Sequence, residues 1–564
     1  MCGIFAITNS DDNPGNDYDV IEKAFYKGQS RGPEFTTLNT YDNLYIGFHR
    51  LAINGLNDES NQPFEINNTV MVCNGEIYNF KQLAEENSIQ LTTDSDCEII
   101  LHLYLKYGIE YTLSLLDGVF AIIIYDKNEN KLIAARDPYG VRPLYYYIEN
   151  HTVGFASELK VLYDLPIIKN TIRHFEPGNF MVLDKLDNWL WNESQFKKYT
   201  SFPCSNIKYT SDASVVLQME LLDHIQDAVI KRVSGTTERP VGCLLSGGLD
   251  SSLIAALVNK YYHSELPLET FSIGLPGSED LKYAAVVAKH LGTKHHEIIV
   301  SEKEFFDAIP EVIKTIESYD TTTIRASVGN YLLGKYIAEN TDCKVIFNGD
   351  GADELMGGYL YFKKAPNAYE FDRECKRLLQ DIHMYDVLRS DRCIASHGLE
   401  PRTPFLDKSW VEFYLTIDRD LRYNTTKDKC EKYLLRNTIH TLAYELLPTE
   451  ILWRTKEAFS DGVSSLTKSW FEIIRDNITE MFNEPDNINL EGELISIMSN
   501  YSRRPYSTIT TPTTYEQAYY RSIYNKWYHD TDHLIPYFWM PKYVDATDSS
   551  ARTLKFYDED NTNK

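Results

Sequence analysis

The sequence lacks three features that define whole classes of proteins: paired cysteines, a basic surplus and long apolar runs. Its nine cysteines are an odd number without a CxxC spacing, which argues against a disulfide framework and favours a reducing compartment. The net charge of −26 argues against general binding to nucleic acid or to anionic membranes. No apolar run reaches the length of a membrane span, and residues 1–30 show no signal-peptide pattern. We therefore expect a cytoplasmic protein with no nucleic-acid partner and no membrane partner.

A Walker A lysine is also absent from the most informative stretch of the chain, residues 240–252. Residues 241–245 are apolar and predict a buried strand, and residues 250–262 carry apolar side chains at helical spacing. The glycines between them allow a tight turn, and the free N–H groups of the turn and of the first helical turn favour an anion. The stretch therefore predicts a phosphate site, with an ordinary glycine-rich turn as the alternative. SGGLDSS, residues 246–252, resembles the pyrophosphate loop of ATP pyrophosphatases, which cleave ATP between its α- and β-phosphates.

Strand and helix signals alternate after this loop. At 564 residues and 43% hydrophobic composition the chain is long enough for two or three domains. The alternation predicts a C-terminal α/β domain, a parallel sheet with helices on both faces, which binds ligands at the carboxyl ends of its strands. The predicted strands are residues 269–275, 296–300 and 344–348, and the predicted helices are residues 280–291, 302–316 and 331–340.

Cys2 has a chemical use at the start of the chain. If Met1 is removed, Cys2 becomes the N-terminal residue, and its own α-amino group can act as the general base for its thiol. The alternative interpretation is a small buried cysteine at the start of an edge strand.

Several polar residues of the first third suit the groups of free glutamine. Arg50 suits the α-carboxylate as a bidentate donor, and Glu76 and Asp96 suit the α-ammonium group. The Asn74 side chain and the Gly75 N–H suit the oxyanion that forms when a thiol attacks an amide. These residues predict a glutamine site beside Cys2.

The first third also contains DGVFA (117–121), ARDPYGVRPLY (135–145), FASE (155–158) and EPG (176–178). Together with the residues above, these motifs resemble the glutamine amidotransferase domain of the N-terminal nucleophile family. The resemblance covers roughly residues 1–190 and implies an α+β four-layer sandwich, in which two antiparallel sheets pack between helices. It implies Cys2 as the nucleophile, while Arg31 and Arg136 are interpreted as structural ion-pair partners. The glutamine-binding residues it implies are Arg50, Leu51, Ala52, Ile53, Asn54, Asn74, Gly75, Glu76 and Asp96.

The later motifs resemble the synthetase domain of glutamine-hydrolysing asparagine synthetases. They are FSIGLPGSED (271–280), YDTTTIRAS (319–327), a long run over 348–368, LEPRTPFLDK (399–408) and WRTKEAFSDG (453–462). Residues 539–554 resemble the tail of the eukaryotic forms. The implied division is a glutamine amidotransferase domain over 1–190, a linker over 191–213, a synthetase domain over 214–535 and a C-terminal tail over 536–564.

This second resemblance also implies roles for single residues. Asp250 and Asp353 would organise Mg²⁺ and pyrophosphate, Lys456 would neutralise phosphate charge, and Arg325 would bind a carboxylate or phosphate. Asp350, where the family has glutamate or aspartate, would govern adenylate formation or ammonia attack. The implied ATP-binding residues are Leu244, Ser246, Gly247, Gly248, Leu249, Asp250, Ser251, Ile273, Asn348 and Gly349.

Taken together, the resemblances imply a two-site ligase without a prosthetic group. Cys2 would release ammonia from L-glutamine, and ATP with Mg²⁺ would convert L-aspartate to β-aspartyl-AMP, from which ammonia displaces AMP to give L-asparagine. An apolar tunnel between the sites is implied, because ammonia must not be protonated in transit, and dimers in the family hint at a homodimer. Two alternatives are the same architecture acting on a different carboxylate, and a catalytically impaired glutamine- and ATP-binding sensor or scaffold. The presence of Cys2, Arg50, Asn74 and Asp96 argues against the first, and the intact Cys2 and SGGLDSS argue against the second.

Overall fold

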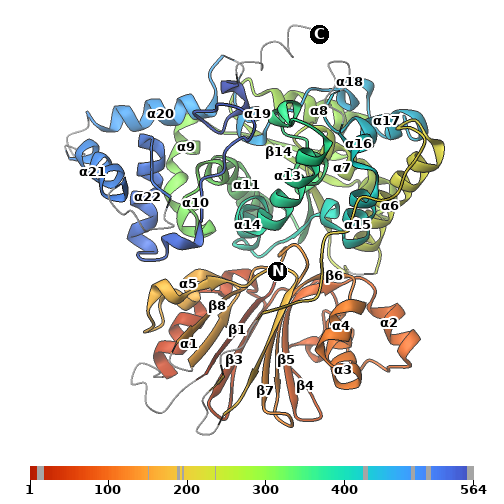
Figure 1. Cartoon of the computed structure of the whole chain (residues 1–564), viewed down its shortest axis with the longest axis vertical. Coiled ribbons are helices and arrows are strands. Elements are labelled where there is room, and N and C mark those ends of the chain that lie inside the picture. The colour runs from red at the N-terminus through yellow and green to blue at the C-terminus, as the bar shows by residue number, and fades with distance from the viewer. Residues whose placement is uncertain are drawn as a thin grey trace.

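The computed structural model describes residues 1–8, 18–149, 152–186, 191–192, 196–235, 237–423, 430–465, 467–483, 489–502 and 510–554. The predicted linker and tail therefore lie partly outside the described residues. The chain forms two parts stacked along its long axis, with the N-terminus between them (Figure 1). Two six-stranded antiparallel sheets build the first part and a five-stranded parallel sheet builds the second, which confirms the two-part architecture and the parallel sheet.

The two sheets of the first part enclose one apolar layer. Along β1 the side chains alternate, so that Ile4 and Ala6 enter the core between the sheets. Phe5 and Ile7 point the other way and pack with Ile21 of α1. The first sheet has the order β10 (Arg173–His174), β8 (Tyr145–Glu149), β9 (Thr152–Ala156), β1 (Gly3–Thr8), β3 (Leu44–Arg50), β2 (Phe35–Tyr41). The second has the order β12 (Lys197–Lys198), β11 (Asn179–Asp184), β7 (Lys131–Arg136), β6 (Gly118–Asp126), β5 (Thr69–Ile77), β4 (Phe64–Ile66).

Helices cover the outer faces of both sheets, so the layers are helix, sheet, sheet and helix. Met71 and Cys73 of β5 pack against Leu83 and Ile99 of the helices beside the second sheet. The edge strand β12 belongs to the second sheet, although its residues follow residue 190, the predicted end of this domain. The helices of the first part are α1 (Tyr18–Tyr26) and α5 (Leu159–Tyr163) on one side, and α2 (Phe80–Asn87), α3 (Glu98–Tyr107) and α4 (Ile109–Leu115) on the other.

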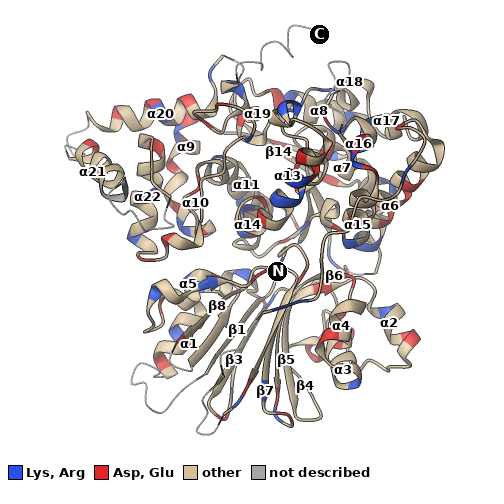
Figure 2. Cartoon of the chain, in the orientation of Figure 1, with Lys and Arg blue, Asp and Glu red and all other residues tan. Residues whose placement is uncertain are grey.

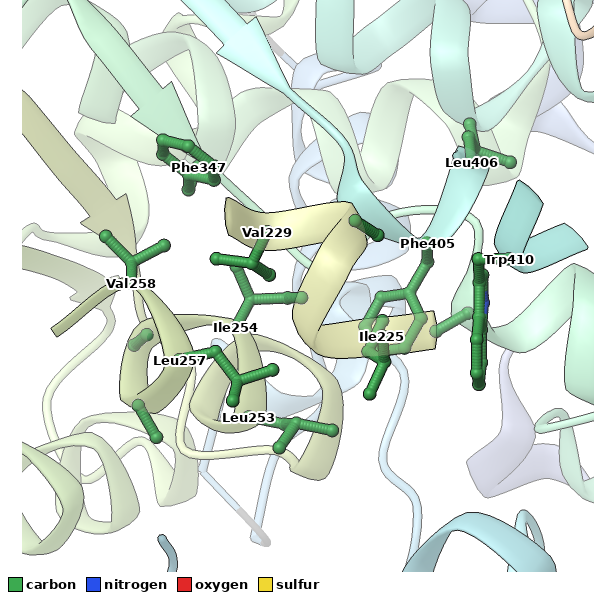
Figure 3. Packing of buried hydrophobic residues seen from close by; sticks show 14 of the residues in the cluster. Ile225, Val229, Leu253, Ile254, Leu257, Val258, Phe347, Phe405, Leu406 and Trp410 are labelled. Atoms are coloured by element: carbon green, nitrogen blue, oxygen red, sulfur yellow. The ribbon is translucent and has the colours of Figure 1, made fainter. Parts of the chain in front are cut away.

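The parallel sheet of the second part has apolar residues packed on both faces. Val241 and Phe347 belong to the cluster that includes α6 and α7, and Phe271 and Ile346 belong to the cluster on the opposite face. Figure 3 shows the first cluster, in which side chains of α6 and α7 interdigitate beside Phe405 and Trp410. The strand order is β15 (Lys294–Ile299), β14 (Glu269–Gly274), β13 (Val241–Leu244), β16 (Val345–Phe347), β17 (Glu400–Arg402).

Two of the predicted helices differ in extent from the observed ones. The segment predicted as one helix over 302–316 is two helices, because Pro310 lacks an N–H donor and stands in the first turn of the second helix. The helix predicted over 331–340 begins ten residues earlier, at Thr321, where the Asp320 side chain accepts a hydrogen bond from the Thr323 N–H. The threonines of this first turn have low helix propensity, which hid the start of the helix from sequence reasoning.

The second part is otherwise helical, and in Figure 2 acidic and basic residues are interspersed over its visible helices. No helix in the described ranges is both long and apolar enough to span a bilayer. The helices are α6 (Val215–Val233), α7 (Leu249–Tyr261), α8 (Glu279–Leu291), α9 (Glu302–Asp307), α10 (Ile309–Ile316), α11 (Thr321–Asn340), α12 (Ala352–Met356), α13 (Ala368–Asp381), α14 (Asp386–Ala395), α15 (Lys408–Thr416), α16 (Arg419–Arg422), α17 (Tyr433–Leu442), α18 (Thr449–Leu452), α19 (Phe459–Gly462), α20 (Trp470–Met481), α21 (Leu490–Ser502) and α22 (Tyr515–Trp527).

Buried ion pairs join the two parts. Arg31 of the first part pairs with Asp391 of α14, with Nη1 and Oδ2 2.6 Å apart, and both side chains are almost fully buried. The interpretation of Arg31 as an ion-pair partner is therefore confirmed. The same interpretation of Arg136 is wrong, because its guanidinium donates to the backbone carbonyls of Arg142, Gly140 and Phe175. Backbone carbonyls satisfy a buried guanidinium as well, and a sequence does not distinguish the two kinds of partner.

Candidate active sites

Cys2 stands directly before β1 and is partly buried. Its Sγ lies 3.7 Å from the carbonyl oxygen of Leu51, and burial raises the pKa of the thiol. Met1 is 1% exposed, and burial lowers the pKa of its own α-amino group to about 6. This environment favours the neutral amine near pH 7, which is the form that accepts a proton.

Arg50 is a buried cation without a carboxylate partner among the described residues. It ends β3, and its guanidinium donates to the backbone carbonyl of Asn57 at 2.9 Å and to Oδ1 of Asn61 at 2.7 Å. It also donates to the carbonyls of Asn54 and Gly55. These neutral partners hold the side chain in place and leave its charge available for an anion. The predicted residues 51–54 follow Arg50 directly, and Leu51 supplies the carbonyl next to the thiol.

Asn74 and Glu76 lie on the same face of β5, because side chains alternate along a strand. Asn74 is 1% exposed, and neither its Nδ2 nor its Oδ1 has a hydrogen-bond partner in the described part of the chain. An unpaired buried amide is costly, so it indicates a group that a ligand completes. Gly75 between them has no room for a side chain, since a Cβ there would lie 2.5 Å from the Val119 carbonyl oxygen.

The pKa values of both acids of this pocket are raised. Burial raises the pKa of Asp96 to about 6, and the hydrogen bond from the Ile77 N–H opposes the rise. Burial and the neighbouring Asp96 raise the pKa of Glu76 well above its ordinary value. At pH 7 Asp96 is therefore ionised and is available to an ammonium group in this pocket.

Arg402 is a residue of this pocket that sequence reasoning did not assign. It comes from β17 of the second part, and its Nη2 reaches Oε2 of Glu76 at 3.4 Å. Its Nε is 2.8 Å from Oε1 of Glu400. Arg402 lies in the LEPRTPFLDK motif, which supported the resemblance to the family but predicted no role for any of its own residues.

The second part contains an open cavity at the carboxyl ends of β13, β14 and β16. Residues from four separate motifs line it together, although they are far apart in sequence. Gly247 is not among the lining residues, because its positive φ of 70° turns the loop against α8. The predicted residues in the lining are Leu244, Ser246, Gly248, Leu249, Asp250, Ser251, Ile273, Asn348, Gly349, Asp350, Asp353 and Lys456.

Two lysines and two aspartates alternate on one wall of the cavity. The Nζ of Lys432 is 2.5 Å from a carboxylate oxygen of Asp250 and 2.5 Å from one of Asp353. The Nζ of Lys456 is 2.5 Å from the other oxygen of Asp353. Burial alone would raise the pKa of Asp353, but the two lysines lower it well below its ordinary value. Lys432 was missed, because a lysine in the charged run KDKCEK predicts a solvated surface.

Asp350 faces a second charge group in the same cavity. Its Oδ1 is 3.0 Å from Nη2 of Arg389, which also pairs with Asp386 at 2.8 Å. Oδ2 of Asp350 is buried and has no hydrogen-bond partner among the described residues. Arg389 and Asp386 are three residues apart on α14, a pattern that predicts an ordinary surface pair, so sequence reasoning gave them no role.

Arg325 does not line the cavity. Burial opposes its charge, but Glu516 and Asp548 raise its pKa well above the ordinary value. Its Nη2 is 2.6 Å from Oε2 of Glu516, and its Nη1 is 2.7 Å from Oδ1 of Asp548. Both sides of the guanidinium are thus neutralised by carboxylates of the chain, so a bound substrate would have to compete with them.

Comparisons with known proteins agree with this division into two sites. A family model described as a glutamine amidotransferase domain matches residues 1–222, and one described as asparagine synthase matches residues 220–370 and 363–506. The chain is 42% identical to an asparagine synthetase (glutamine-hydrolysing) of Gallus gallus, with 99% of each chain covered. It is 41% identical to the protein of that name from Mus musculus, again with 99% of each covered. A solved glutamine phosphoribosylpyrophosphate amidotransferase from B. subtilis shows 18% identity, covers 53% of this chain and 81% of that chain, and has a TM-score of 0.31, too low to support an argument.

The two glycines of the loop give a matched pair of substitutions. In Gly247→Ala, the Cβ would approach the backbone of Tyr283 and Ala284 at 2.5 Å at a positive φ, so we expect a loss of about 1–3 kcal/mol in the free energy of unfolding. In Gly248→Ala, the Cβ would meet only Ser246 Oγ at 3.4 Å, so we expect a change within about 0.5 kcal/mol. Chemical denaturation measures both. Equal losses in the two variants would contradict this account of the loop.

Proposed function

The chain belongs to the family of glutamine-hydrolysing asparagine synthetases, and on that premise we propose that its two sites perform successive steps of one reaction. L-glutamine supplies ammonia at the first site, and ATP activates L-aspartate at the second, where L-asparagine forms. The observation that carries the proposal is that residues from four motifs line one cavity, namely residues 244–246, 248–251, 273, 348–351, 353 and 456.

The first step uses Cys2 after removal of Met1. The thiol sulfur attacks the carbonyl carbon of the glutamine side-chain amide, and the α-amino group accepts the thiol proton. The unpaired Nδ2 of Asn74, which is almost fully buried, would donate a hydrogen bond to the resulting oxyanion. Ammonia then leaves with the proton, a thioester remains, and water releases glutamate. Arg50 would hold the α-carboxylate and Asp96 the α-ammonium group.

The second step activates the β-carboxylate of aspartate, which is a poor electrophile at neutral pH. A carboxylate oxygen attacks the α-phosphorus of ATP, and the bond to the bridging oxygen breaks as pyrophosphate leaves. Lys432 and Lys456 would neutralise charge on the departing phosphates, and Leu244 and Ile273 would contact adenine. Ammonia then attacks the acyl carbon of β-aspartyl-AMP and AMP leaves. The unpaired oxygen of Asp350, held by Arg389, would accept a proton from the attacking ammonia.

Asp250 and Asp353 fit a Mg²⁺ ion that enters with ATP. Oxygen ligands from carboxylates and phosphates are those that Mg²⁺ prefers, and Oδ1 of Asp250 is buried without a hydrogen-bond partner in the described residues. Within those residues no cluster of three or more metal-ligating side chains occurs, so two carboxylates plus phosphates are the set available. The ion would offset the charge of the phosphates.

Apolar contact across the two parts supports an apolar path for ammonia. Leu51, Ile53 and Val141 of the first part belong to the same buried cluster as Val233 and Val241 of the second. Such a lining excludes water and so keeps ammonia unprotonated. Leu51 also contacts the thiol of Cys2 through its carbonyl, which places this cluster next to the first site. A cytoplasmic location and a homodimer remain parts of the proposal.

Product analysis of a Cys2→Ala variant tests the proposal. With L-aspartate and Mg-ATP, we expect the wild type to form L-asparagine, AMP and pyrophosphate with either glutamine or ammonium. The variant should lose asparagine formation from glutamine and keep it from ammonium, because only the nucleophile is missing. Cys204→Ala, which removes an exposed cysteine, is the matched control and should retain both. Pyrophosphate release with another carboxylic acid, but not with aspartate, would favour the alternative substrate instead.

The charge of Asp96 predicts a pH dependence of glutamine binding. Burial raises the pKa of Asp96 to about 6, so the carboxylate is ionised above that pH and protonated below it. We expect the KM for glutamine to rise as the pH falls through 6, because the protonated acid no longer attracts the ammonium group. In Asp96→Asn the KM should be high at every pH. The exposed Asp94→Asn is the control, and its profile should match the wild type. A wild-type KM that stays constant from pH 5 to 8 would contradict the role of Asp96.

A further inference from the structure

The C-terminal segment, residues 545–554, returns to the wall of the ATP cavity. In Figure 1 this dark blue segment lies beside α19. Nε of Arg552 is 2.9 Å from Oε1 of Glu457, and its Nη1 donates to the backbone carbonyl of Ser465 at 2.8 Å. Nη1 also donates to Oγ of Ser464. One guanidinium thus joins three residues of the segment that follows Lys456.

Two neighbours of Arg552 bind a buried carboxylate of the same segment. Oγ of Ser550 donates to Oδ1 of Asp461 at 2.7 Å, and the N–H of Ala551 donates to Oδ2 at 3.2 Å. Asp461 is 1% exposed and lies in α19. A buried carboxylate needs such donors, so the position of α19 depends on the C-terminal segment.

The segment also contacts a second helix that lines the cavity. Oδ1 and Oδ2 of Asp548 accept hydrogen bonds from the guanidinium of Arg325 at 2.7 and 2.8 Å. Arg325 lies on α11, and the neighbouring α11 residues Thr322 and Ala326 line the cavity. The ion pair between Arg325 and Asp548 therefore connects α11 to the C-terminal segment.

Lys456 lies between two anchors. Residues 454–458 form no helix or strand, and all of them line the cavity. On the N-terminal side, Nη2 of Arg454 is 2.9 Å from Oδ1 of the buried Asp280. On the C-terminal side, the next residue after Lys456 is Glu457, which is held by Arg552. An irregular segment keeps a fixed conformation only where such contacts determine it.

We propose that Arg552 is a positioning residue for Lys456, and that the C-terminal segment completes the ATP-binding cavity from outside it. Arg552 is not among the residues that line the cavity, and it acts through Glu457, Ser464 and Ser465. The inference deepens the proposed function, on which it rests, by making nucleotide affinity depend on residues 548–552. It assigns the glutamine site no such dependence, because no contact between residues 545–554 and the glutamine pocket occurs among the described residues.

Nucleotide binding by Arg552→Ala tests the proposal in the full chain. Because charge-assisted hydrogen bonds are lost, we expect the Kd for Mg-ATP, measured by calorimetry, to rise about tenfold or more. Glutamine hydrolysis by the same sample should keep the wild-type rate, which shows that the protein is folded. The matched control is Lys542→Ala, which removes a tail cation that pairs with Glu374 of α13 at 3.0 Å and leaves the cavity wall intact. Its Kd should equal that of the wild type.

Two further variants separate positioning from a general loss of stability. The lysine of Arg552→Lys can keep a contact with Glu457, but it lacks the planar guanidinium that also reaches Ser464 and Ser465. The Kd of this variant should therefore lie between those of the wild type and Arg552→Ala. A chain that ends at residue 544 should bind Mg-ATP at least as weakly as Arg552→Ala. An unchanged Kd in Arg552→Ala, or an equal loss of glutamine hydrolysis, would overturn the proposal. The calorimetric readout needs no aspartate, so failure of aspartate activation in the wild type is a distinct result.

Discussion

The buried ion pair between Arg31 and Asp391 connects the segment that holds Cys2 to a helix that borders the ATP cavity. Nε of Arg31 donates to the backbone carbonyl of Cys2 at 3.0 Å, and its Nη1 is 2.6 Å from Asp391 of α14. The same helix carries Arg389, which holds Asp350 at 3.0 Å in the ATP cavity. Helix α14 is thus linked through Arg31 to the backbone of Cys2 at one point and to Asp350 in the ATP cavity at another. Loss of one partner of such a buried pair leaves an uncompensated charge, which destabilises by about 3–5 kcal/mol.

Polar and apolar contacts accompany this ion pair at the junction of the two parts. Arg402 extends from β17 to Glu76 of the glutamine pocket, so residues of the second part complete the first site. Leu51 and Ile53 extend in the other direction, into the core that surrounds β13 and α7. A rigid apolar junction between two sites suits a small neutral intermediate that loses its reactivity when water protonates it.

Local signals sufficed for much of the fold and for most of the cavity. The apolar run and glycines at 241–248 specify β13, the turn and the start of α7, since strand, turn and helix are all local there. The residues that escaped prediction depend on partners distant in sequence. From the sequence, Lys432 is predicted to be a solvated charge, whereas in the fold it pairs with Asp250 and Asp353. Arg325 was predicted to bind an anion, because the sequence does not show that its partner is Asp548, more than two hundred residues later. The sequence alone does not show whether a charged residue is buried, because that depends on the fold. Glycines and apolar periodicity, by contrast, indicate local structure directly.

Isotope competition tests most directly whether the two sites are one coupled reaction. The wild-type protein would receive L-aspartate, Mg-ATP, amide-¹⁵N glutamine and an excess of unlabelled ammonium, and mass spectrometry would give the ¹⁵N fraction of the asparagine. Direct transfer along the junction predicts a ¹⁵N fraction well above that of the ammonium in solution. A fraction equal to that of the bulk ammonium would show that the sites exchange ammonia only through solvent, and it would contradict the account.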